Sequence, residues 1–187
     1  MSGLENLSER DRAVLRSIFD PTAVIGDVAD DEDNFQDDEP EPSTPEYLES
    51  KSLRFHGAQL AEAGKLEEAL EEMNKAVKAA PESPAAYNDR AQLLRLMLKD
   101  DEAMSDLDRA LQLTVGQRCR ARALALCQRG VVLRKRRADD EARAAFAEAA
   151  TIGSSFAKKQ VVEMNPYAAL CNQMLSQVLR GDKEIKL

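Results

Sequence analysis

The chain has 187 residues, with 34 acidic and 26 basic side chains, a formal net charge of -8 and only 4% aromatic residues. No run of about 18 apolar residues exists, which excludes a membrane-spanning helix, and the first residues lack the pattern of a secretory signal. We therefore expect a cytoplasmic, helix-rich protein with reduced thiols. The cysteines are too scattered for a disulfide framework or a zinc site: Cys119, Cys127 and Cys171.

Residues 1–20 are predicted to contain a short amphipathic helix. Ser8 can cap it, and it should end at Asp20, because the following Pro21 disfavours helix in the residue before it. Such a helix is too short to be stable alone, so we expect it to dock on its own body or on a partner. Its apolar side consists of Val14, Leu15, Ile18 and Phe19.

Residues 21–45 are predicted to be a flexible acidic linker. The stretch from Ser17 to Ser50 holds twelve acids and no Lys or Arg, so it carries -12 and the remainder of the chain +4. Few apolar residues are available there to offset the entropy lost on ordering. Two interpretations stay open: a solvated spacer, or an acidic ligand for a basic surface.

Residues 46–156 repeat one helical pattern three times, in units of about 50–83, 84–117 and 123–156. Shifts of 34 and then 39 residues bring five positions into register. Each unit is predicted to be two antiparallel helices whose small residues permit close approach and whose bulky residues fill the space between units. The positions are Gly57/Ala91/Gly130, Leu60/Leu94/Leu133, Ala69/Ala103/Ala142, Met73/Leu107/Phe146 and Ala76/Ala110/Ala149.

This pattern resembles the tetratricopeptide repeat (TPR), whose period is 34 residues. It departs from the family pattern in keeping the large aromatic residue only as Tyr87 and the closing proline only as Pro81. The resemblance implies an all-α superhelix of three helix-turn-helix repeats, with capping helices within 157–181 and a tail at 182–187. We expect helices near 46–63, 66–79, 84–98, 100–113, 118–136, 139–151, 154–164 and 166–179.

The whole chain resembles a small vertebrate TPR family with the same three-repeat layout. The block Asn165–Leu175 and the motif Ser17–Pro21 carry this likeness most specifically, together with the acidic stretch. The resemblance implies a cytoplasmic adaptor linked to Hsp70-type chaperones. It does not imply catalysis.

Catalysis also finds little support in the residues themselves. His56 is the only histidine, which excludes a His-based triad or a two-His metal site, and the glycines form no phosphate-binding loop. We expect His56 to pack between the helices of the first repeat. No enzyme activity, cofactor or metal is predicted.

Binding is better supported, because the first helices of successive repeats should line a concave groove. Positions three and four apart on each of these helices share one face. They are modestly basic and polar, which suits an acidic segment or a C-terminal carboxylate. The candidate groove residues are Lys51, Arg54, Asn88, Asp89, Gln92, Arg95, Gln128 and Arg134, with Ala58, Ala61, Ala85, Leu124, Cys127, Val131 and Lys135 beside them.

A carboxylate clamp is disfavoured. Chaperone-binding TPR relatives hold the terminal carboxylate of Hsp70 or Hsp90 with Lys, Asn, Asn, Lys and Arg. Only Arg54 keeps this chemistry here, and the charge of Asp89 would repel a carboxylate. The five matching positions read Arg54, Ala58, Asp89, Leu124 and Gln128.

The third repeat carries a dense basic cluster, Arg134–Arg137 with Arg118, Arg120, Arg122 and Arg129. It is interpreted as a solvated helix face or as a docking site for acidic segments, including residues 27–46 of this chain. A nucleic-acid patch is disfavoured, since no aromatic residues interleave for base stacking.

Two functions remain. The favoured one is a monomeric adaptor or co-chaperone that binds a chaperone or client segment in its groove, without nucleic acid or membrane partners. The alternative is a structural stabiliser that shields one dedicated client through its convex face and terminal helices.

Overall fold

The computed structural model describes residues 33, 35 and 42–165. The chain divides into Met1–Asp33 and Asn34–Leu187, and all the described helices belong to the second unit. The predicted N-terminal helix, most of the acidic linker, the helix at 166–179 and the tail lie outside the described residues.

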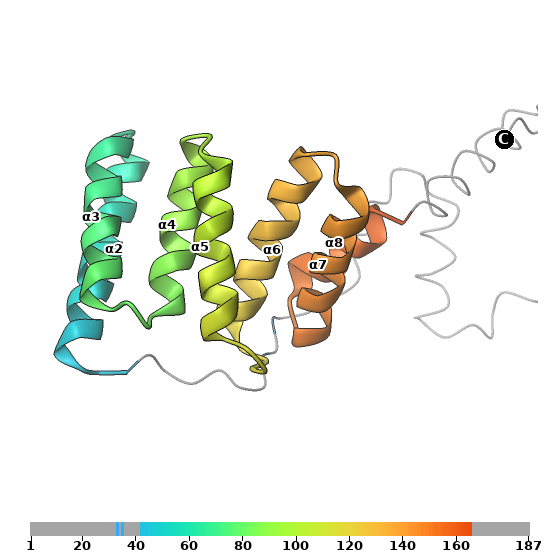
Figure 1. Cartoon of the computed structure of the whole chain (residues 1–187), viewed down its shortest axis with the longest axis horizontal. Coiled ribbons are helices and arrows are strands. Elements are labelled where there is room, and N and C mark those ends of the chain that lie inside the picture. The colour runs from blue at the N-terminus through green and yellow to red at the C-terminus, as the bar shows by residue number, and fades with distance from the viewer. Residues whose placement is uncertain (1–32, 34, 36–41, 166–187) are drawn as a thin grey trace, which may run out of the picture. The chain divides into compact units, whose positions relative to one another are not determined.

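Residues 42–165 form seven helices and no strand, which confirms the all-α prediction (Figure 1). Consecutive helices pack as antiparallel pairs, and the pairs stand side by side in chain order. Each predicted helix of this region is present, with bounds that agree to within two residues. The helices are α2 (Pro45–Glu62), α3 (Leu66–Ala79), α4 (Pro84–Leu96), α5 (Asp100–Leu113), α6 (Arg120–Lys135), α7 (Asp139–Ile152) and α8 (Ser155–Glu163).

Local chemistry sets the helix ends. The Ser83 side chain accepts a hydrogen bond from the Ala86 amide at 3.4 Å, and Pro84 occupies the first helical position of α4. Ser154 caps α8 in the same way through the Ala157 amide at 3.3 Å. Acidic residues fill the first turns of α5 and α7, where they face the positive end of the helix dipole.

The turn inside each repeat uses a left-handed backbone at the same template position. Gly64, Leu98 and Arg137 have φ angles of 77°, 60° and 63°. Glycine adopts this conformation without strain, whereas leucine and arginine adopt it at a steric cost. The second and third repeats therefore hold a strained turn that the first does not.

The predicted close approach of paired helices occurs at the small residues. Gly57, Ala91 and Gly130 are buried, and a Cβ added to Gly130 would lie 2.7 Å from two ring carbons of Phe146. The same Cβ on Gly57 would meet the flexible end of Met73 at 3.1 Å.

Among the described residues, the core consists of three hydrophobic clusters. The largest joins α6, α7 and α8 around the fully buried Phe146, whose ring meets that of Phe156 edge-on with centroids 6.0 Å apart. A second cluster surrounds Leu107 and includes Ala125 of the next repeat. The smallest contains Ala69, Met73 and Leu93.

The first helices of neighbouring repeats are also spatial neighbours. Helix α4 contacts both α2 and α6, while α8 packs on α7. This arrangement brings the predicted groove residues of three repeats onto adjacent helices.

Candidate peptide-binding groove

The predicted groove residues lie on α2, α4 and α6, and we call their shared surface the first-helix face. Their exposure differs widely. Lys51, Gln92 and Arg134 are exposed, whereas Asn88 is almost fully buried. The other predicted residues are half-buried: Arg54, Asp89, Arg95 and Gln128.

Arg54 of α2 and Asp89 of α4 form an ion pair. The Arg54 Nη1 atom lies 3.1 Å from Asp89 Oδ2, and the Arg54 side chain is only 12% exposed. The sequence predicted a binding cation and a separate repelling carboxylate at these positions. The two charges instead offset each other and join the first repeat to the second.

Asn88 and Gln128 join the second repeat to the third. The Asn88 side-chain amide donates to the Ala121 carbonyl at 2.8 Å, and Gln128 Nε2 donates to the Asn88 carbonyl at 3.2 Å. Both residues were predicted to face a ligand. In the chain without a ligand their donors serve α4 and α6, and their contact with a ligand stays a prediction.

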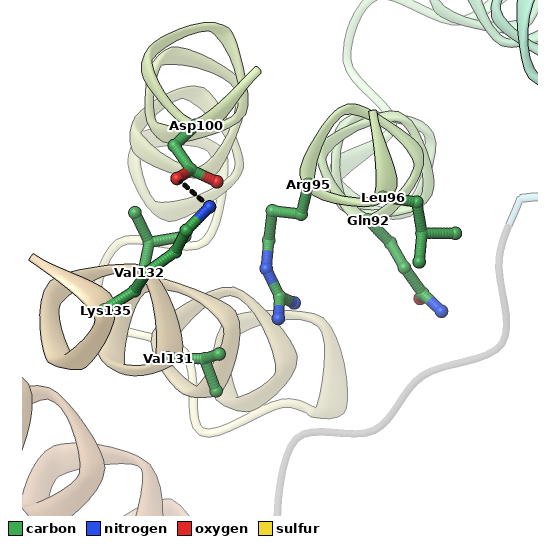
Figure 2. Close-up of a pocket in the computed structure, with 7 residues that line it drawn as sticks. All are labelled: Gln92, Arg95, Leu96, Asp100, Val131, Val132 and Lys135. Carbon is green, nitrogen blue, oxygen red and sulfur yellow. Dashed lines mark hydrogen bonds and ion pairs between the residues drawn. The ribbon is translucent and has the colours of Figure 1, made fainter. Parts of the chain in front are cut away.

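A hollow of about 240 Å³ opens between α4 and α6. Figure 2 shows the Arg95 side chain reaching from α4 toward α6 and Val131, while the Lys135 ammonium lies 2.5 Å from the Asp100 carboxylate. The lining mixes apolar and cationic side chains, a combination that can hold a segment carrying both apolar and acidic residues. It consists of Gln92, Arg95, Leu96, Asp100, Val131, Val132 and Lys135.

Arg95 is the charged group most affected by this environment. Burial lowers its pKa, and the nearby negative charge of Asp100 partly opposes that effect. An arginine remains protonated at neutral pH even so. Its Nη1 atom lies 3.5 Å from Gln128 Oε1, a long hydrogen bond that an acidic ligand could replace at little cost.

The basic cluster of the third repeat is largely paired with acids on neighbouring helices. These pairs favour the interpretation as a solvated helix face, although exposed ion pairs are weak and exchangeable. The Arg118 guanidinium donates to the Thr151 carbonyl. The ion pairs are Arg122–Glu148, Arg129–Asp108, Arg134–Glu163, Lys135–Asp100 and Arg136–Asp101.

His56 does not pack between the helices as predicted. Its side chain is 59% exposed, and its Nδ1 atom lies 3.4 Å from Glu72 Oε2. The Lys75 hydrogen bond, with a smaller contribution from His56, lowers the pKa of Glu72. The prediction was wrong, since the imidazole lies at the surface beside a carboxylate of α3.

The equivalent positions of the second repeat hold a stronger network that the sequence analysis missed. Arg90 and Asp106 lie 34 residues after His56 and Glu72, and their side chains pair through contacts of 2.6 and 2.7 Å. Arg90 also donates to Asn74 at 3.0 Å. The hydrogen bond with Asp106 raises the pKa of Arg90. The shift of 34 residues, applied to charged as well as apolar positions, could have revealed this pair.

Within the described residues, no group of three or more His, Cys, Asp or Glu side chains could hold a metal ion. Cys119 and Cys127 are buried, as expected for structural thiols. None of the helices described is long and apolar enough to cross a membrane.

Comparison with solved structures places the repeats among TPR domains. The first TPR domain of Spaghetti (RPAP3) bound to the HSP90 peptide SRMEEVD aligns with a TM-score of 0.55 and 21% identity, covering 66% of this chain and 95% of that one. The second TPR domain of human RPAP3, in complex with the HSP70 peptide SGPTIEEVD, aligns with a TM-score of 0.53 and 20% identity, covering 64% and 97%.

Sequence comparison is more specific. No protein-family model matches the chain. Tetratricopeptide repeat protein 36 of Danio rerio is 45% identical, with 92% of each chain covered. The protein of that name from Homo sapiens is 41% identical and covers 90% of this chain and 92% of its own. With the three repeats in the structure, these likenesses show that the chain belongs to the tetratricopeptide repeat protein 36 family.

Proposed function

We propose that this protein is a non-enzymatic cytoplasmic adaptor or co-chaperone that binds a segment of another protein on its first-helix face. The hollow between α4 and α6 carries this proposal, because Leu96 and Val131 offer apolar contact beside the cations Arg95 and Lys135. Aligned first helices present such side chains at regular intervals, which is the mode by which repeat stacks bind extended segments.

The preferred ligand is an internal acidic and apolar segment rather than a chain terminus. A terminal carboxylate needs a free cation at the clamp, and Arg54 is paired with Asp89. A link to an Hsp70-type chaperone would therefore use contacts other than the clamp. The RPAP3 domain with its HSP70 peptide supports the general mode of binding but not this set of residues.

The proposal is tested by reversing charge on the first-helix face without disturbing the core. The triple variant Lys51→Glu, Gln92→Glu and Arg134→Glu alters only exposed side chains. Its matched control, Lys78→Glu, Gln112→Glu and Arg143→Glu, makes the same chemical changes on α3, α5 and α7. Affinity capture from cytosol, followed by mass spectrometry, should show partners lost by the first variant and kept by the control.

The opposite result would favour the alternative function. If the control variant loses its partners while the first-helix variant keeps them, the protein shields a client through its convex face. Circular dichroism of both variants establishes that any loss of binding does not come from unfolding.

A second experiment examines the clamp directly. The peptide SGPTIEEVD, which occurs in the RPAP3 complex, should bind the wild-type chain weakly. Asp89→Asn removes the repelling charge, so it should strengthen binding by about tenfold, the gain expected from one charge-assisted hydrogen bond. Tight wild-type binding that survives Arg54→Ala would show that another surface holds the peptide.

A further inference from the structure

Phe35 is an isolated bulky apolar side chain within the acidic segment. Between Val28 and Tyr47, no other aromatic or large aliphatic residue occurs. A segment of this composition is expected to remain solvated, because it has little apolar surface to bury. Eight acids lie within six residues of Phe35: Asp30, Asp31, Glu32, Asp33, Asp37, Asp38, Glu39 and Glu41.

The structure places Phe35 against the third repeat. Its side chain is half-buried and packs against the hydrophobic cluster of α6, α7 and α8. Val131 packs against the same cluster and also lines the hollow between α4 and α6. Phe35 and the hollow therefore both adjoin this hydrophobic cluster. Phe35 has no apolar neighbour in the sequence that would add to its contact.

A short stretch of chain joins Phe35 to the first repeat. Pro42 follows it by only seven positions, a span of at most about 24 Å, and α2 begins at Pro45. A short tether of this kind gives the side chain a high effective concentration at its contact. An external segment that uses the same contact must therefore compete with Phe35.

Charge favours the binding of an acidic segment by the third repeat. The side chains of Arg134, Lys135 and Arg136 are at least one-third exposed. Two of their partners, Glu163 and Asp101, are surface acids, whereas the third, Asp100, is 19% exposed. Ion pairs of this kind contribute little and exchange readily. Acids that flank an aromatic residue can replace Glu163 and Asp101 without leaving a buried charge unpaired.

We infer that the third repeat binds an aromatic side chain flanked by acids, and that Phe35 occupies this site in the free protein as an internal competitor. This inference rests on the proposed function, since it names the class of protein segment that the third repeat would bind. An incoming protein segment would need both an aromatic residue and neighbouring acids to displace Phe35.

The occupancy of the site by Phe35 can be measured by fluorescence. The chain contains no tryptophan, so Phe35→Trp gives a single reporter in the full-length protein. Phe55→Trp is the matched control, because Phe55 is 67% exposed. The Phe35→Trp variant should emit at shorter wavelength and be quenched less by acrylamide than the control. Equal emission and equal quenching in the two variants would overturn the inference.

Competition is measured with a labelled peptide that spans residues 30–42. If Phe35 occupies its site about nine-tenths of the time, the Phe35→Ala chain should bind this peptide about tenfold more tightly than wild type. A peptide with Ala in place of Phe should not bind either chain. Equal affinities of the two chains for the Phe-containing peptide would contradict the competition.

The two proposals fail in distinguishable ways. If the reporter at position 35 is exposed while the first-helix variant still loses its partners, the binding function stands and the internal competitor does not. If the reporter is buried and the first-helix variant keeps every partner, Phe35 packs on the third repeat but the proposed binding surface is wrong.

Discussion

The first and third repeats follow one template but differ in how completely they are packed. In the first, Gly57 faces the flexible Met73, and the outer side of α2 exposes 55% of Leu48 and 67% of Phe55. In the third, Gly130 faces the rigid, fully buried ring of Phe146, and α8 adds Phe156 from the other side. The two repeats share the same residue pattern. The third contains the largest hydrophobic cluster because its helix pair is covered on both sides.

The largest difference should come from removing the bulky residue of each repeat. Phe146→Ala leaves a cavity among rigid neighbours and should cost about 4 kcal/mol, whereas Met73→Ala should cost about 2 kcal/mol. Urea unfolding followed by circular dichroism measures both. Equal losses would mean that the two repeats are packed equally well.

The small residues provide the reverse test. Gly130→Ala places a methyl group 2.7 Å from the Phe146 ring and should cost about 3 kcal/mol through overpacking. Gly57→Ala meets only the mobile end of Met73 and should cost less than about 1 kcal/mol. Adding Phe146→Leu to Gly130→Ala should recover part of the loss. An unchanged loss in that double variant would assign the cost to something other than the ring.

The second repeat differs from the first in the charged pair between its two helices. Asp106→Asn leaves the half-buried Arg90 without its counter-charge and should cost about 2 kcal/mol. Glu72→Gln, the equivalent change in the first repeat, should cost far less because its partners His56 and Lys75 are more than half exposed. A double-mutant cycle with Arg90→Gln isolates the pair. A small coupling energy would show that Arg90 and Asp106 act independently.

Glycine in the strained turns should stabilise the later repeats. Leu98→Gly and Arg137→Gly relieve left-handed strain and should each raise the free energy of unfolding by about 0.5–1 kcal/mol. The exposed Leu98 side chain makes little contact that would be lost. Gly64→Ala should have the opposite effect in the first repeat. Loss of stability in Leu98→Gly would mean that this side chain contributes packing.

The smallest expected effect concerns pH. The pKa of Glu72 lies below its ordinary value of 4.5, first because of the Lys75 hydrogen bond. A carboxyl with a lowered pKa stabilises the fold fully above its ordinary pKa, and this contribution is lost as the pH falls through the lowered value. The difference in free energy of unfolding between wild type and Glu72→Gln should therefore become smaller as the pH falls from 7 to 3. Urea unfolding midpoints at each pH measure this difference. A difference that does not change with pH would indicate that the charge of Glu72 does not contribute to stability.

The repeat pattern predicted the fold well, because helix pairing depends on residue size at fixed spacings. Gly57 and Gly130 illustrate this, since a single small residue determines which helices can approach. The binding role of the groove residues stays a prediction. Arg54 and Gln128 are at the predicted positions, but their partners Asp89 and Asn88 lie on the neighbouring helix, and side-chain direction decides whether such residues pair with each other or face a ligand.

The five additional residues between the second and third repeats create a practical opportunity. Arg122 donates to the carbonyls of Leu111 and Thr114 at 3.2 and 3.3 Å and pairs with Glu148 at 2.6 Å. This side chain holds α5, α6 and α7 in place beside the connection, while Val115 is 73% exposed. The connection is therefore a suitable point for attaching a dye or an affinity tag without disturbing the helices.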